Sequence, residues 1–448
     1  MGAKRLNPHP HPTGAPMNNV KPQPPRVEID FTDAQLTGQG GLALLGQLGQ
    51  RFALPQRLGE LIQLKRRRRG ASDAQMLWAL IGSLAAGNGA LSDLDALRED
   101  TPTATLLGLD AVPSGRRLGE YLSRMSEPQI EALQRLAREL AAQVAPDVVA
   151  HQRDTHGYVP VFVDGTAIEV EGQLFEQAAT GYDGTTQYWL HSVFVGGLWS
   201  SARLHPGGVD VAKGWREQLE HDIAPLFDQT TPVWVHADNA YYRKGFVELC
   251  RHYGWDYSVS VTHDGYRRPV LEVIEGLSEQ GWQPIGAGES ATLVYYRPSG
   301  WSHEHAYVVV RGEHQGPQQA LIPHYSVILV SRDDLPLDEL VARHRQKQGQ
   351  ENAFKGPLLD MDLHHPPCRR FRANQAFYQC GQIAQILLRA LQYQLLPASA
   401  RRHGLRPLIR YAIRSVARLV HTGRRLRLDF AKTTHHLKWL LHASIQLE

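Results

Sequence analysis

Apolar side chains recur at helical spacing over residues 30–155, so this first part of the chain is predicted to be mostly helical. In DAQMLWALIGSLAAGNGALSDLDALRED (73–100) the spacing is interrupted at Gly87–Gly89, which predicts a break between helices. In VPSGRRLGEYLSRM (112–125) a Pro-Ser start signal precedes apolar residues on one face. Residues 1–29 are polar and rich in proline, and they are predicted to form a disordered tail.

The pattern changes over residues 156–263, where short β-branched runs alternate with helical stretches. YVPVFVDGTAIEVEG (158–172) reads as a buried strand leading into a hairpin, and YWLHSVFVGGLWSSARLHPG (188–207) supplies further strands. VAKGWREQLEHDIAPLF (211–227) is predicted to be helical. PVWVHADNAYY (232–242) is predicted to be a strand followed by a helix from about Lys244. The middle of the chain is therefore predicted to be α/β.

Residues 264–325 carry strands separated by Gly, Pro and polar turns, which predicts a β-rich insertion that returns to the main sheet. Residues 326–396 complete the α/β part with two helices. The first of these covers LPLDELVARHRQKQGQENAFKGPLL (335–359), and the second is strongly amphipathic. Residues 397–448 are predicted to form a basic helical C-terminal region.

The distribution of charge along the chain indicates which kinds of binding partner to expect. The net charge is only +3, but basic residues cluster in KRRRRG (65–70), which contains Arg66, Arg67 and Arg68, and again over 401–432, where Asp429 is the only acid. Such clusters suit a phosphate backbone, although each could also be a solvated helix face. The helical region 30–155 is accordingly expected to bind DNA, or to form a helical cap. Three cysteines imply no disulfide framework, and no run is apolar enough for a membrane span, so a cytoplasmic protein is expected.

Three acids are candidates for chemistry. Asp164 lies in or just after a predicted strand, Asp238 follows a later strand, and Glu351 lies on a helix beyond the insertion. Adjacent parallel strands and a helix crossing their ends would bring the three together, and such carboxylates suit two Mg²⁺ ions acting on a phosphodiester. The alternatives are ordinary ones: Asp before Gly is a turn signal, and Asp238 with Asn239 could cap the next helix.

The segments FVDGTAIEV, HADNAYYRKGFVELC and HRQKQGQENAFKGPLLDMDLHHPP resemble the three acidic motifs of bacterial insertion-sequence transposases of the DDE class. The resemblance extends over nearly the whole chain and is greatest to the insertion-sequence family called thirteen-eighty. It implies a ribonuclease-H-like catalytic core with a β-rich insertion, flanked by N-terminal and C-terminal helical regions. It further implies Asp164, Asp238 and Glu351 as catalytic ligands of two Mg²⁺ ions, with Mn²⁺ able to substitute.

The same resemblance implies a DNA transposase that cleaves at terminal inverted repeats and transfers the released strands. Its partners would be double-stranded DNA and a second copy of the chain in a synaptic homodimer, associated with the bacterial nucleoid. Two alternatives stay open: a DNA-binding repressor of transposition with no catalysis, and a ribonuclease-H-like nuclease that cuts without joining.

Related transposases carry Tyr and Arg seven and four residues before the catalytic Glu and Lys seven after it. This chain has His344, Lys347 and Leu358 at those positions, and Lys355 could replace the later Lys. Inserted aromatic residues of similar enzymes stack on a base flipped from the DNA, although each could equally be a packed core aromatic. The expected DNA contacts are His344, Arg345, Lys347, Lys355, Arg66, Arg67, Arg68, Trp282 and Trp301.

HHPPC (364–368) together with Cys380 could suggest zinc, but the spacing fits no standard four-ligand pattern. The two prolines indicate a loop, and His364 and His365 are expected to order that loop after the helix carrying Glu351.

Overall fold

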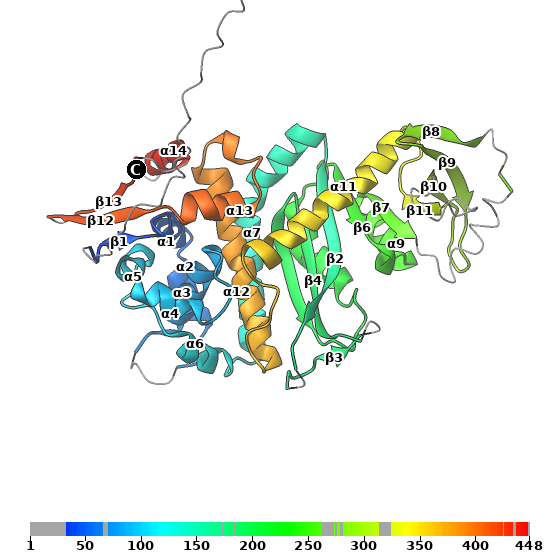
Figure 1. Cartoon of the computed structure of the whole chain (residues 1–448). Helices are drawn as coiled ribbons and strands as arrows, with labels where there is room; N and C mark the ends of the chain where they lie inside the picture. The colour runs from blue at the N-terminus through cyan, green and yellow to red at the C-terminus, as the bar shows by residue number, and fades with distance from the viewer. Residues whose placement is uncertain are drawn as a thin grey trace, which may run out of the picture. The chain divides into compact units, whose positions relative to one another are not determined.

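The computed structural model describes residues 33–446, apart from 66–69, 173, 182–183, 262–272, 274–275, 278–280, 313–323, 424 and 433–435. Side chains at 347–353 and 355 also lie outside the description. The chain divides into Met1–Asp33 and Ala34–Glu448, and every element below belongs to the second unit (Figure 1). The predicted tail at 1–29 therefore lies outside the described residues.

The first part of the second unit is helical, as the apolar spacing predicts. Ser72 and Ser126 each begin a helix with a capping box, and Gly87 leaves the helical conformation with φ +75°. The helices are α1 (Leu42–Arg51), α2 (Leu54–Leu61), α3 (Asp73–Ala85), α4 (Asp93–Glu99), α5 (Thr101–Leu107), α6 (Gly115–Leu122) and α7 (Glu127–His156).

The middle of the chain forms a mixed sheet in the order β3-β4-β2-β6-β7-β11-β10-β9-β8, with β5 beside β4. Strands β2, β6 and β7 run parallel to one another, and the other described neighbours are antiparallel. The strands are β2 (Val159–Glu169), β3 (Ala179–Thr180), β4 (Thr186–Val195), β5 (Leu198–His205), β6 (Val233–Ala237), β7 (Asp256–Val261), β8 (Gln283–Gly286), β9 (Glu289–Tyr296), β10 (His305–Gly312) and β11 (His324–Val330).

The strands predicted within the insertion continue the same sheet instead of starting another one. Strand β11 pairs with β7, so the prediction that the chain returns to the main sheet is confirmed. Strands β10, β9 and β8 then extend the sheet from β11.

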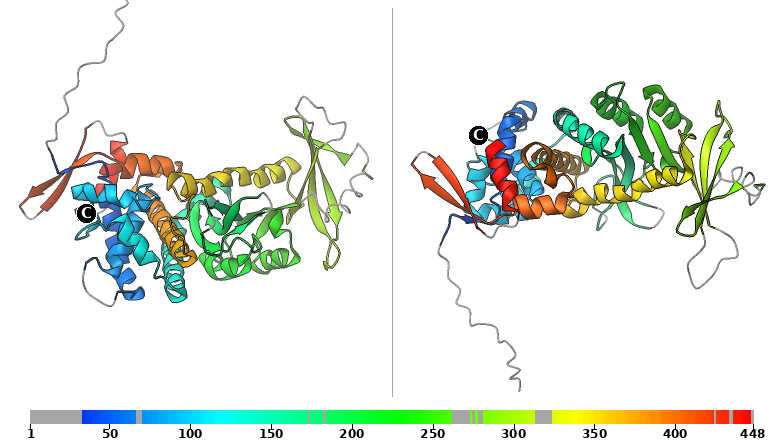
Figure 2. Two further views of the ribbon diagram at one scale, coloured as in Figure 1. Left: turned by 60° about the horizontal axis from the view of Figure 1, so that its bottom comes forward. Right: turned by 90° about the horizontal axis from the view of Figure 1, so that it is seen from above.

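Helices cover both faces of the sheet. One face packs against α9 (Lys244–Tyr253) and the segments α8 (Trp215–Glu217), η1 (Gln218–Ile223) and η2 (Ala224–Leu226). The other face carries α11 (Leu337–Lys355), which contacts β6, β8, β9 and β10 and runs alongside the sheet in Figure 2.

Helix α12 (Phe371–Ala390) covers the exposed edge of β5. Its glutamines donate side-chain hydrogen bonds to carbonyl oxygens of β5: Gln379 to Ala202 at 2.8 Å and Gln382 to Trp199 at 3.1 Å. An unpaired strand edge can pair with another chain and aggregate. The side-chain amides of these glutamines occupy backbone carbonyl oxygens at this edge and thereby block such pairing. The same helix packs on α3 and α7, and it thereby joins the helical region to the sheet.

The C-terminal region is not wholly helical, so that prediction is wrong in part. The residues after Ser415 form a hairpin, because VARLVHTGRRLRLDF alternates apolar and polar residues and Gly423 supplies a turn with φ +58°. The first hairpin strand pairs with β1, and the three strands form a small separate sheet. The elements are β1 (Leu36–Thr37), η5 (Gly356–Asp360), η6 (Leu391–Leu395), η7 (Ala398–Ala400), α13 (Leu405–Leu408), η8 (Ile409–Ile413), β12 (Ala417–Thr422), β13 (Arg425–Phe430) and α14 (Leu437–Gln446).

No helix within the described ranges is both long enough and apolar enough to cross a membrane.

Candidate active site

Asp164 and Asp238 occupy neighbouring positions on two parallel strands, Asp164 within β2 and Asp238 directly after the end of β6. In the parallel pairing of β2 with β6, Val163 lies opposite Ala237, so the next residue on each strand is an aspartate. Neighbouring strands are separated by about 4.8 Å, which brings the two backbones close together. Both aspartates are half-buried.

Backbone amides hold both carboxylates. The amide of Gly165 donates to Oδ1 of Asp164 at 2.9 Å, and the amide of Ala240 donates to Oδ1 of Asp238 at 2.9 Å. The alternative reading of Asp164 as a turn residue is wrong, because β2 continues to Glu169. The reading of Asp238 as a cap is correct: it begins the short η3 helix (Asn239–Tyr241). This cap orients the carboxylate at the strand end.

The two aspartates share a face of the sheet. Asp238 keeps an extended backbone with φ −85° and ψ −172°, so strand alternation places its side chain on the face of Trp234 and His236. Asp164 alternates with Phe162 in the same way. The rings of Phe162 and His236 stack at 5.1 Å, which shows that these two rows face the same side.

Helix α11 crosses this face and is fixed to several strands. His344 Nε2 lies 3.1 Å from Ser260 Oγ of β7, and Gln346 accepts a hydrogen bond from the Tyr158 hydroxyl at 2.6 Å. Further along, Phe354 meets Phe194 of β4 with ring centroids 4.7 Å apart. Strands β2 and β6 lie between β7 and β4 in the sheet order, so the helix passes across the two strands that carry the aspartates.

Glu351 lies in α11 between these anchors. Its side chain is outside the described part of the chain, so its approach to Asp164 and Asp238 stays a prediction. The same holds for the side chains of Lys347 and Lys355.

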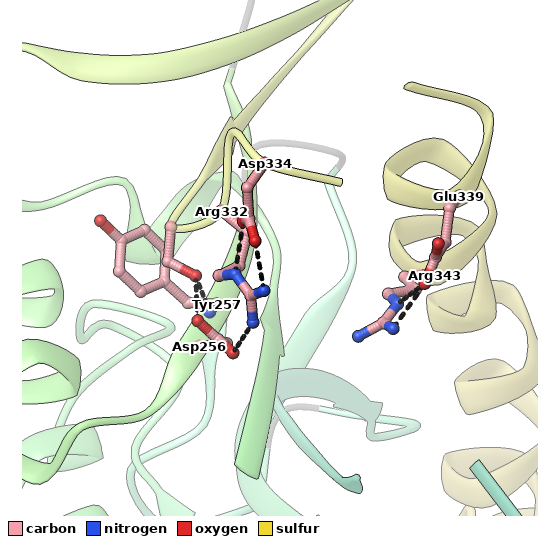
Figure 3. Close-up of polar contacts among 7 residues, drawn as sticks. Asp256, Tyr257, Arg332, Asp334, Glu339 and Arg343 are labelled. Carbon is pink, nitrogen blue, oxygen red and sulfur yellow. Dashed lines mark hydrogen bonds and ion pairs between the residues drawn. The ribbon is translucent and has the colours of Figure 1, made fainter. Parts of the chain in front are cut away.

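The connection into α11 is held by polar contacts at the junction of β7 and β11 (Figure 3). Arg332 binds both carboxylate oxygens of Asp334 at 2.6 Å and reaches Asp256 at 3.4 Å. Arg343, one turn into the helix, pairs with Glu339, and its guanidinium also lies 4.7 Å from the ring centre of Trp234. These contacts set where the helix begins relative to the sheet.

A buried polar pair lies beneath the aspartates, on the opposite face. The hydroxyl of Tyr241 is 2.6 Å from Nε2 of His191, and both residues have no exposed surface. Burial raises the pKa of Tyr241 well above its usual value, and the charges of Asp164 and Asp238 raise it further. Burial also lowers the pKa of His191 to about 3, so the pair is neutral at pH 7.

A further acid, Asp210, lies near the pair of Tyr241 and His191. Arg243 binds it at 2.8 Å and also donates from Nε to the carbonyl oxygen of Ala240 at 2.6 Å. Burial alone would raise the pKa of Asp210, but hydrogen bonds from the Ala212 amide and Arg243 outweigh burial and lower it. Sequence reasoning missed Asp210 and His191. The available signals were an acid after the glycine pair 207–208 and a histidine inside an apolar strand.

The other predicted DNA contacts are spread over the molecule. His344 faces β7, and Arg345 forms two hydrogen bonds of 2.7 Å with Glu289 of β9. Trp282 packs under Arg311, whose guanidinium is 4.4 Å from the ring centre, and Trp301 packs on Tyr242. Arg66, Arg67 and Arg68 lie outside the described residues. The role of each in DNA contact stays a prediction.

The structure gives no additional evidence that HHPPC (364–368) and Cys380 bind zinc. Cys380 is fully buried in α12, whereas His364 lies in the loop after α11 beside the carbonyl oxygen of Leu358, at 3.2 Å. Among the residues whose positions are described, no three His, Cys, Asp or Glu side chains gather as a metal site.

The structure thus combines a mixed sheet, two aspartates side by side on adjacent parallel strands, and a helix that crosses those strands. The chain belongs to the family described as Transposase DDE domain group 1, which matches residues 21–448. Membership supports an insertion-sequence DDE transposase. Such domains generally use divalent metal ions, carry out transposition chemistry and act on DNA. No curated protein matches the chain.

Proposed function

We propose that this transposase binds the terminal inverted repeats of an insertion sequence and catalyses metal-dependent cleavage and strand transfer there. Asp164, Asp238 and Glu351 are proposed as the ligands of two Mg²⁺ ions, for which Mn²⁺ can substitute. The observation that carries the proposal is the register of β2 and β6, in which Val163 lies opposite Ala237, so that Asp164 and Asp238 follow side by side.

The residues present fit such ions. Mg²⁺ prefers oxygen ligands, keeps several of its waters and is bound through a small number of carboxylates. Asp164 and Asp238 supply half-buried carboxylates that follow the paired residues Val163 and Ala237 on adjacent strands. Two like charges held this close repel each other, and a bound cation would relieve that repulsion.

The protein's contribution to the reaction is orientation. Backbone amides fix the carboxylates of Asp164 and Asp238, and α11 holds the helical turn that carries Glu351 across the same face. When bound, the ions would supply charge that activates an oxygen nucleophile and stabilises the leaving oxygen. Alignment of the attacking and leaving oxygens by a rigid site accounts for much of the rate of such reactions.

We further propose that the sheet is a ribonuclease-H-like core of the thirteen-eighty kind. Support comes from the antiparallel strands β2, β4 and β5 followed by β6 and β7 parallel to β2, with helical segments between them. Within this scheme residues 156–263 and 326–396 form the core, and 264–325 are its insertion. Residues 30–155 would contact DNA. Synapsis of two ends would require a homodimer, located in the bacterial cytoplasm with the nucleoid.

Cleavage of a labelled DNA fragment carrying the element's end tests the proposal. The wild-type protein should nick the element boundary with Mg²⁺ or Mn²⁺ and not with EDTA. Asp238→Asn removes one ligand charge at nearly constant volume, so it should lower the rate by more than about 100-fold. The matched control is Glu248→Gln, an exposed carboxylate of α9 whose pair with Lys244 is 3.8 Å long.

Products distinguish the remaining alternatives. Joining of the released 3′ end to target DNA supports the transposase, whereas cutting without joining supports the nuclease. Binding without cutting in every metal condition would leave only a DNA-binding repressor.

A further inference from the structure

The hydrogen bond between Tyr241 and His191 connects two segments on either side of the strand that carries Asp164. Tyr241 belongs to the turn after β6, where its amide donates to the carbonyl oxygen of Asp238 at 3.2 Å. His191 belongs to β4, directly opposite Gly165 of β2. The 2.6 Å bond between the two side chains therefore passes beneath Gly165.

The space beneath Gly165 is closed. A Cβ added at Gly165 would lie 2.5 Å from the carbonyl oxygen of Val211 and 2.5 Å from its Cγ2. The loop carrying Val211 thus packs directly on β2 at the residue after Asp164. A larger residue at this position would require the Val211 backbone to move.

Buried polar contacts near His191 and Tyr241 hold the neighbouring segments in place. Gln218 donates to Ser201 at 2.8 Å, Ser201 donates to Asp222 at 2.6 Å, and Asp222 binds Arg203 at 2.8 Å. Ser201, Gln218 and Asp222 are all buried. These buried hydrogen bonds link β5 to η1 and limit the movement of the two segments.

We propose that Tyr241 and His191 are a positioning pair that sets the separation of Asp164 and Asp238, and thereby the affinity of the site for divalent cations. The inference rests on the proposed function, because it assumes that these two aspartates are ligands. The pair acts through the backbone: it ties the turn of Asp238 to β4, and β2 with Asp164 lies between them.

Titration of the full-length protein with Mn²⁺, followed by electron paramagnetic resonance of the free ion, tests the pair without any cleavage assay. Tyr241→Phe keeps the ring and removes only the hydroxyl. Loss of a group that orients metal ligands typically weakens metal binding 10–100-fold, so Mn²⁺ affinity should fall by about tenfold or more.

Tyr378→Phe is the matched control. Tyr378 is also fully buried, and its hydroxyl donates one hydrogen bond of 2.9 Å to the carbonyl oxygen of Leu363. The variant should lower the thermal midpoint about as much as Tyr241→Phe does and leave Mn²⁺ affinity unchanged. Equal loss of Mn²⁺ affinity in both variants would overturn the inference, because it would reflect general loosening.

His191 provides a second, independent variant. His191→Gln keeps a hydrogen-bonding group near the position of Nε2 and should retain most of the Mn²⁺ affinity, whereas His191→Leu should lose it as Tyr241→Phe does. A His191→Leu protein that is folded and binds Mn²⁺ like the wild type would overturn the inference.

Asp238→Asn separates this inference from the proposed function. If the wild type binds Mn²⁺ and Asp238→Asn does not, the aspartate site exists, and wild-type affinity in Tyr241→Phe would reject the positioning pair alone. If the wild type and Asp238→Asn bind Mn²⁺ equally, the ligand assignment fails and the inference fails with it.

Discussion

Buried histidines near the site couple its integrity to pH. Burial lowers the pKa of His191 to about 3, and the pKa of His205 is lowered to about 4 by burial and by nearby Lys213 and Arg203. Around His191 lie Tyr241, His205, Arg203 and Asp210. A histidine that is neutral in the folded state and free to protonate in the unfolded state favours unfolding in acid.

The expected result is a loss of stability as the pH falls from 7 to 5. The unfolded chain gains a proton on His191 below its ordinary pKa of 6.5, whereas the folded chain gains none until about pH 3. The free energy of unfolding is therefore unaffected by His191 above pH 6.5, and it decreases as the pH falls below 6.5. For His191 this amounts to about 2 kcal/mol between pH 7 and pH 5.

Urea unfolding at both pH values measures this difference. His191→Gln should flatten the dependence of unfolding free energy on pH, and His421→Gln, at an exposed position of β12, should leave it unchanged. An equal slope in the wild type and His191→Gln would contradict the prediction.

At the scale of single residues, the sequence singled out the two aspartates but not their surroundings. Asp164 and Asp238 were chosen because each follows an apolar run, and this run marks a strand end at Asp238 but not at Asp164, where β2 continues. The contact between His191 and Tyr241 joins residues far apart in the chain, and no local pattern encodes it. In YWLHSVFV the histidine is a single polar residue in an apolar strand. Its partner Tyr241 comes near it only because β4, β2 and β6 lie side by side in the folded sheet.

Among the elements, the C-terminal hairpin has two unlike faces. The register of β12 with β13 places Leu419 opposite Leu428 on one face, and it places Val420 opposite Arg427 on the other. Arg418 and Arg425 share the face of Arg427, and all three arginines are exposed. The apolar face packs toward the core, so the basic face is available for contact with DNA phosphates.

Replacing Arg418, Arg425 and Arg427 together with Ala should reduce the salt dependence of DNA binding. Each lost phosphate contact lowers the slope of log affinity against log salt by about 0.9, so three contacts would lower it by about 2.7. The slope is measured by fluorescence anisotropy between low and moderate salt. Lys at the same three positions retains the charge and should retain the slope, and an unchanged slope in the Ala variant would exclude the hairpin from the DNA interface.

The same hairpin shows where helical periodicity misleads. Residues 397–448 were predicted to be helical, and this holds for α13, η8 and α14 but not for β12 and β13. In RLRLDF the period changes to two, and Gly423 permits the turn. By contrast, α11 and α12 were predicted correctly, and α12 in particular has a long apolar face with no competing turn signal.

For the whole molecule, the sequence predicted that the insertion returns to the main sheet, but it did not predict that β10, β9 and β8 extend that sheet. The strands of the insertion were expected, but pairing partners depend on edges that meet only in the folded chain. Strand β11 pairs with β7 on one side and β10 on the other, so the insertion shares backbone hydrogen bonds with the strands of the site.

Native-state hydrogen exchange should therefore report one cooperative unit. The amides of Val308 in β10 and Val235 in β6 are both buried within this sheet, and their free energies of opening should agree within about 1 kcal/mol. A much lower opening free energy at Val308 would mean that the inserted strands unfold separately from the core.

The order of the acids along the chain also sets when the proposed site can exist. Asp164 and Asp238 belong to neighbouring strands but are 74 residues apart in sequence, and Glu351 follows Asp164 by 187 residues. At a synthesis rate of 5–20 residues per second, roughly 10–40 s separate the emergence of the first acid from that of the last. A nascent polypeptide that carries β2 and β6 but not yet α11 would lack the third proposed ligand throughout this interval. Competence to cut DNA would then be gained late in translation, after most of the fold has been made.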